Sequence, residues 1–134
     1  MPICATASKK IVTKLLKEHK DYLANNNLTL EAASLVSMIS KLKAKGLTAD
    51  DALAKVAEYS ALSQEERDRR MRTQKKDILL DKTGPVIASV YKVYEKSLRE
   101  SNSLDFDDLL LFGVKLFATH KKASSWCQHV LVDE

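Results

Sequence analysis

Residues 103–110 read S-L-D-F-D-D-L-L and fix where the last long helix of the chain begins. Asp105 is a favoured N-cap residue, and Asp107 and Asp108 then fall in the first turn, where carboxylates interact well with the positive end of the helix dipole. The stretch therefore predicts a helix that runs to about Thr119. Three apolar side chains at helical spacing are expected in the core: Phe106, Leu109 and Leu110.

Upstream of this stretch, apolar residues repeat every three or four positions in five further segments. These segments begin near Ser8, Thr29, Thr48, Ser63 and Pro85. Gly46 is expected to end the second segment in a left-handed C-cap, and the fourth is expected to continue to Leu80. With three Gly and two Pro, the chain has too few turn formers for a sandwich or barrel. The sequence thus predicts a mainly α fold, with about six helices in an irregular bundle.

The hydrophobic period changes at the end of the sequence. Residues 130–132 read V-L-V and are followed by Asp133 and Glu134, which predicts one C-terminal β-strand that ends in two carboxylates. One strand cannot form a sheet alone, so we expect the rest of its sheet to lie outside this chain. Many P-loop NTPases use an apolar strand that ends in Asp and Glu to hold Mg²⁺ and activate water. A charged tail without function is the alternative interpretation.

Together, the motif at residues 103–110 and the later V-D-E at 132–134 resemble the UvrD-like superfamily 1 DNA helicases, most nearly their fungal anti-recombinase branch. Members of that family read close to S-L-D-F-D-D-L-L, then a helix, then a strand that ends in V-D-E-F/Y-Q-D. Residues 39–43 look like the family's I-S-x-x-K stretch, and residues 90–95 look like its tyrosine-rich helix. The sequence departs from the family because it has no G-x-x-x-x-G-K-[ST] motif and no F/Y-Q-D after Glu134.

The resemblance implies a division of the chain and a function for its parent protein. Residues 1–124 would be a helical accessory subdomain, and residues 125–134 the strand that returns to the ATP-binding P-loop motor domain, where the sequence is truncated. Asp133 would be the magnesium ligand and Glu134 the catalytic base. The parent would be a nuclear, ATP-dependent 3′-5′ DNA helicase that acts in DNA repair or recombination control. ATP and Mg²⁺ would be its cofactors, whereas the isolated fragment, without a P-loop, is predicted to use neither and to be inactive.

Positive charge is concentrated in the first hundred residues. The whole chain has a net charge of +4, whereas residues 101–134 carry a net −2. Basic side chains that neutralise phosphates release counterions, so such clusters favour salt-dependent contact with the DNA backbone. A solvated helix face is the alternative, and no aromatic residues interleave the clusters to stack on bases. The DNA-binding candidates are Lys41, Lys43, Lys45, Arg69, Arg70, Arg72, Lys75 and Lys76.

Two other functional readings of the sequence remain open. The chain could be a non-enzymatic all-α module that binds DNA or a protein helix, or a structural bundle that uses the tyrosine helix at residues 90–95 as an interaction face. No segment approaches the roughly 20 apolar residues that span a bilayer, and the N-terminus lacks signal-peptide features. We therefore expect an intracellular, soluble protein with no membrane association. The resemblance implies that its partners are DNA, through backbone contacts with a single strand and the adjoining duplex, and the rest of the helicase motor.

Overall fold

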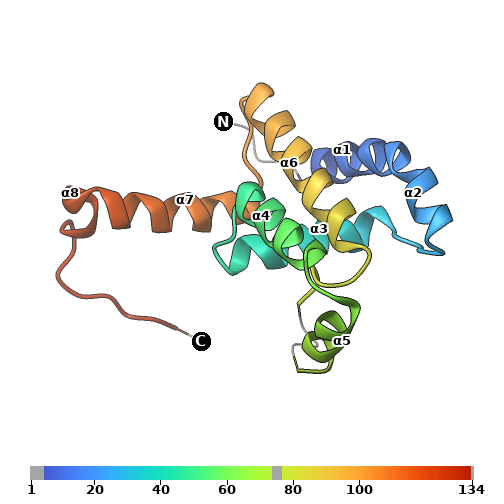
Figure 1. Cartoon of the computed structure of the whole chain (residues 1–134). Coiled ribbons are helices and arrows are strands. Elements are labelled where there is room, and N and C mark those ends of the chain that lie inside the picture. The colour runs from blue at the N-terminus through green and yellow to red at the C-terminus, as the bar shows by residue number, and fades with distance from the viewer. Residues whose placement is uncertain (1–4, 74–76, 134) are drawn as a thin grey trace.

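The computed structural model describes residues 5–73 and 77–133 (Figure 1). Within these residues the chain forms helices and no β-sheet, so the predicted mainly α fold is confirmed. The helices are α1 Ala5–Glu18, α2 Lys20–Asn25, α3 Ala32–Ala44, α4 Ala49–Ser60, α5 Gln64–Thr73, α6 Gly84–Glu100, α7 Phe106–Thr119 and α8 Lys121–Ser124. None of the described helices is long and apolar enough to cross a bilayer.

Helix α6 is the centre of the bundle and packs against α1, α3 and α4. Pro85 lies in its first turn, where the missing backbone N–H costs no hydrogen bond. Apolar positions three and four apart then place a buried stripe along the helix. This stripe consists of Val86, Ile87, Val90, Tyr91, Tyr94 and Leu98. Its partners in the core include Val12 and Leu15 of α1 and Leu35, Ile39 and Leu42 of α3.

Three helices end in the same left-handed cap. Gly46 has a φ of 75°, and Asn27 and Asn102 have φ values of 52° and 51°. After each cap residue, the next backbone N–H reaches back to a carbonyl five residues earlier, as in the bond from Leu47 N to Leu42 O at 3.0 Å. The predicted cap at Gly46 is confirmed. Asparagine performs the same role at the other two ends, which explains how a chain with three glycines can end its helices sharply.

Side-chain caps begin α4, at the predicted start near Thr48, and α7, where Asp105 is the predicted N-cap. Thr48 accepts a hydrogen bond from Asp51 N at 3.2 Å while the Asp51 carboxylate accepts one from Thr48 N at 2.9 Å. Asp105 and Asp108 form the equivalent capping box, with bonds of 2.9 and 3.2 Å. Each box satisfies two backbone N–H groups that the helix itself cannot.

Two predicted helix boundaries are wrong. The first helix does not begin near Ser8, because α1 is already formed at Ala5 and Ser8 lies buried inside it. The helix predicted to reach Leu80 does not extend that far, because residues 77–80 are not helical. Helix α5 is described to Thr73, and its charged sequence buries no residue. The Asp77 carboxylate accepts a hydrogen bond from Leu79 N at 3.1 Å and so stabilises a turn. This turn places the side chains of Leu79 and Leu80 in the core.

The C-terminal third also departs from expectation. Helix α7 extends away from the bundle (Figure 1), so its apolar residues are not in the core. The predicted strand at 130–132 does not form, and Leu131 is 97% exposed. A strand requires a neighbour to complete its hydrogen bonds, and the described part of the chain contains no sheet that could supply one. The exposed apolar residues of α7 are Phe106, Leu109, Leu110, Phe112, Val114, Leu116 and Phe117.

Candidate functional site

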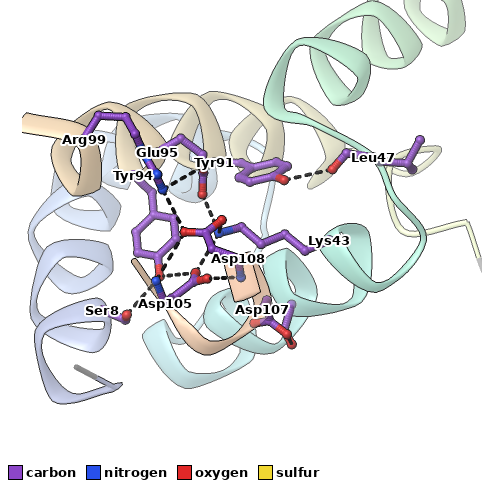
Figure 2. Close-up of polar contacts among 11 residues, drawn as sticks. Ser8, Lys43, Leu47, Tyr91, Tyr94, Glu95, Arg99, Asp105, Asp107 and Asp108 are labelled. Atoms are coloured by element: carbon purple, nitrogen blue, oxygen red, sulfur yellow. Dashed lines mark hydrogen bonds and ion pairs between the residues drawn. The ribbon is translucent and has the colours of Figure 1, made fainter. Parts of the chain in front are cut away.

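A lysine is buried where α3, α6 and α7 meet (Figure 2). The side chain of Lys43 has no exposed surface, and its Nζ lies 2.5 Å from Glu95 Oε1. The same nitrogen donates hydrogen bonds to Asp105 Oδ2 at 2.7 Å and to Asp108 Oδ1 at 3.0 Å. One ammonium group therefore joins three carboxylates from two other parts of the chain, and we call these four residues the Lys43 cluster.

Further contacts surround the Lys43 cluster. Arg99 Nη2 donates to the other oxygen of Asp108 at 2.7 Å, so this fully buried carboxylate has a cation on each side. The Tyr94 hydroxyl donates to Asp105 Oδ2 at 2.7 Å and lies 2.9 Å from Ser8 Oγ. The capping box of α7 is thus part of the network, because Asp105 and Asp108 bind the helix terminus and Lys43 at the same time.

Burial and ion pairing act against each other on the pKa values of the Lys43 cluster. Burial disfavours the charged form of Lys43, but its bonds to the carboxylates outweigh this and raise its pKa. Burial likewise opposes ionisation of Asp105, yet the bonds from Lys43 and Tyr94 lower its pKa. At Glu95 burial dominates and raises the pKa, although Lys43 opposes the shift.

These shifts define the pH range in which the cluster contributes to stability. Because the pKa of Asp105 is lower in the folded chain, its contribution is present above the unfolded pKa and is lost as the pH falls through the folded value. Because the pKa of Lys43 is higher in the folded chain, its contribution is present below the unfolded pKa and is lost as the pH rises through the folded value. The Asp105–Lys43 attraction is therefore available around neutral pH.

The carboxylates of the Lys43 cluster do not form a metal site. Within the described residues, Glu95, Asp105 and Asp108 are the one group of three acidic side chains close enough to share an ion. The ammonium of Lys43 already occupies the position between them. The cation that these carboxylates require is thus supplied by the chain itself.

Of the two residues predicted to serve ATP hydrolysis, the structure describes one. Asp133 is exposed at the end of an extended segment, and it is not part of the acidic group described above. Glu134 lies outside the described residues. One exposed carboxylate is too few protein ligands to hold Mg²⁺ without nucleotide phosphates, so the described residues do not by themselves fit the metal.

Seven of the eight predicted DNA-binding residues fall into three groups. Lys41, Lys45, Arg69 and Arg72 are exposed on or beside α3 and α5. Arg70 is half-buried, pairs with Glu66 at 3.3 Å and lies over the Tyr59 ring. Lys75 and Lys76 lie outside the described residues.

Lys43 does not belong to an exposed DNA-binding surface, and this part of the prediction is wrong. Its ammonium is fully buried among carboxylates, so a phosphate could reach it only after the cluster had opened. Tyr91 and Tyr94 of α6 are buried in the core, so these two side chains are not available to an interaction face on this helix. The Tyr91 hydroxyl is instead used inside the fold, where it donates to Leu47 O at 2.8 Å.

The Lys43 cluster was not predicted from the sequence, although one signal for it was present. Lys43 follows Leu35 and Ile39 on the same apolar stripe of α3, at spacings of four residues. A lysine within an apolar stripe requires a buried partner, because an isolated charge in the core is costly. Its partners lie more than fifty positions away, so the stripe alone cannot identify them.

Comparison with known proteins assigns the class. The sequence model of the UvrD/REP helicase N-terminal domain matches residues 4–134, and the chain belongs to this family. A segment of 44 residues is 46% identical to the ATP-dependent DNA helicase SRS2 of Saccharomyces cerevisiae (strain ATCC 204508 / S288c). That segment covers 33% of the chain and 4% of the yeast helicase, so the chain spans only a small part of its relative. No solved structure matches this chain.

Replacing Lys43 tests the energetic role of the cluster. In Lys43→Met, Asp105, Asp108 and Glu95 stay buried without their shared cation, so the free energy of unfolding should fall by about 3–5 kcal/mol. The matched variant Lys41→Met changes an exposed lysine of the same helix and should alter the free energy of unfolding by less than about 0.5 kcal/mol. Urea unfolding followed by circular dichroism measures both values. Equal effects of the two substitutions would show that the cluster does not stabilise the fold.

Proposed function

We propose that this chain is the helical accessory part of an ATP-dependent 3′-5′ DNA helicase that acts in the nucleus in DNA repair or recombination control. Residues 1–124 form the accessory subdomain, and residues 125–134 return to the ATP-binding motor domain. The observation that carries the proposal is the family match across residues 4–134, which spans both the capping box of α7 and the V-D-E at its end. The similarity to the SRS2 helicase supports the same function.

Asp133 and Glu134 are the residues that this proposal assigns to ATP hydrolysis in the full-length parent. Bound Mg²⁺ would neutralise charge on the nucleotide phosphates. Asp133 would hold the ion through a carboxylate oxygen, and Glu134 would accept a proton from the attacking water. The exposure of Asp133 supports this assignment, because the carboxylate is accessible to the rest of a motor domain.

Contacts with DNA are assigned to the basic side chains that remain accessible. Lys41, Lys45 and Arg72 are exposed and form no ion pair within the described residues, and Arg69 is exposed beside Glu66. Such groups contact phosphates rather than base edges, so binding by this chain should be weak and independent of sequence. Arg70, Lys75 and Lys76 are assigned to the same function.

The apolar side of α7 is assigned to the rest of the motor. Leu110 is 73% exposed, and the apolar residues 130–132 are still more exposed. Soluble proteins rarely leave such a large apolar surface uncovered. The motor domain to which residues 125–134 return is the partner that this proposal provides for it.

A non-enzymatic all-α module is the alternative, since it could carry the same basic surface and bind DNA or a protein helix. The gene sequence on either side of this reading frame distinguishes the two. Codons for a Walker lysine upstream and for F/Y-Q-D directly downstream support the helicase. Their absence supports the module.

Salt dependence tests the DNA-backbone contacts. A labelled single-stranded oligonucleotide should bind the chain at low salt and lose affinity steeply between about 50 and 200 mM NaCl. Lys41→Gln combined with Arg72→Gln should lower the slope of log affinity against log salt by about two, because two phosphate contacts are removed. Fluorescence anisotropy measures the slope. As a control, Lys121→Gln with Lys122→Gln removes two charges from α8 and should leave the slope unchanged. A salt-independent affinity would contradict the assignment.

The isolated chain should not hydrolyse ATP. It has no glycine-rich loop to hold the phosphates, and carboxylates alone would repel a nucleotide. A phosphate-release assay with MgATP should give no rate above buffer, and Asp133→Ala should give the same result. Turnover by the chain that disappears in Asp133→Ala would overturn this prediction.

A further inference from the structure

The first helices form a second basic surface that the helicase assignment does not use. Lys10, Lys14 and Lys17 are spaced four and three residues apart and so form one stripe along α1, and Lys9 lies beside it. All four are exposed, and none forms an ion pair within the described residues. Together with Thr13 they line a shallow depression of about 440 Å³.

An apolar groove adjoins this lysine stripe. Its volume is about 370 Å³, and it lies between the end of α1, α2 and the segment that leads into α3. It shares Thr13 and Lys17 with the depression, so the two form one continuous surface. The floor is made by Leu16, Leu23, Ala24, Leu28 and Leu30, and Lys17 and Lys20 form the rim.

The described part of the chain does not cover this surface. Figure 1 shows α1 and α2 at one end of the molecule, whereas α7, α8 and the C-terminal segment extend at the other. Glu18, Asp21 and Glu31 each follow a groove-lining residue in sequence, and none of them lines the groove or pairs with its lysines in the described structure. The groove therefore combines an apolar floor with an uncompensated positive rim.

We propose that this groove binds an acidic amphipathic helix from a partner protein. Leucine or phenylalanine side chains three and four residues apart would fill the floor, as in other helix-in-groove complexes. Glutamate or aspartate along the flank would pair with Lys10, Lys14 and Lys17, whose spacing matches two turns of a helix. Charge complementarity would also steer the encounter and reject basic partners.

Nucleic acid fits this groove less well. Single strands bind through aromatic platforms on which bases stack, and the groove lining contains no aromatic side chain. A phosphate backbone would use the lysines but gain nothing from a floor of leucine and alanine. The proposal does not depend on the helicase assignment, because a partner helix could bind here in either kind of protein.

A designed peptide provides the test. The probe is a fluorescein-labelled helix of about four turns, with leucines on one face and glutamates on its flanks, titrated with the full chain and followed by anisotropy. We expect weak binding, with Kd on the order of 10–100 μM. Peptides with lysine in place of glutamate, or serine in place of leucine, should not bind. If either binds as well as the probe, the proposal is overturned.

Two sets of variants separate the rim from the floor. Lys14→Gln with Lys17→Gln should weaken peptide binding at least tenfold, whereas Lys121→Gln with Lys122→Gln should not. Ala24→Gln places a polar group on the exposed floor without changing charge and should weaken binding at least fivefold. Its control is Ala54→Gln, at an exposed alanine of α4. Circular dichroism should show the same helix content in every variant.

The floor variant decides between the possible occupants. If Ala24→Gln leaves peptide affinity unchanged, attraction by the lysines alone explains the binding and the proposal is overturned. It is also overturned if a single-stranded oligonucleotide binds this surface more tightly than the peptide and depends on Lys14 and Lys17. Dimerisation of the chain that is abolished by Ala24→Gln would show that a second copy fills the groove, and would overturn it as well.

Discussion

The buried ammonium of Lys43 is the interaction on which the arrangement of the helices most depends. Lys43 belongs to α3, and its ammonium binds a carboxylate of α6 and two carboxylates at the start of α7. Replacing a buried cluster of this kind with apolar residues can be neutral, whereas removing one member leaves uncompensated charge. The cluster therefore specifies one arrangement of these helices more than it adds to total stability.

Helix α7 depends on this arrangement more than the other helices do. Most of its apolar side chains are exposed, so hydrophobic burial contributes little to its attachment. Its first turn, in contrast, is held through Asp105 and Asp108, which cap the helix and bind Lys43 in the same network. The direction of α7 sets where residues 120–133 leave the bundle (Figure 1).

The local features of the fold could be predicted from sequence because their determinants are local. The caps at Thr48, Asp105 and Gly46 each depend on two or three nearby residues, and all are present. The bonds of Lys43 to Asp105 and Asp108, by contrast, span 62 and 65 positions, and no local pattern encodes them. The burial of α7 was wrongly predicted for a related reason: periodicity identifies an apolar face but not what covers it. The strand predicted at 130–132 does not form, because a strand needs a neighbouring strand to complete its hydrogen bonds.

A double-mutant cycle between Lys43 and Asp108 tests the central role of the cluster most directly. Lys43→Met, Asp108→Asn and the double variant would be unfolded in urea beside the unchanged chain. If the two side chains act as one unit, the loss in the double variant should be smaller than the sum of the single losses by about 1–3 kcal/mol. Losses that add to within about 0.5 kcal/mol would contradict the account, because the two residues would then stabilise the fold independently.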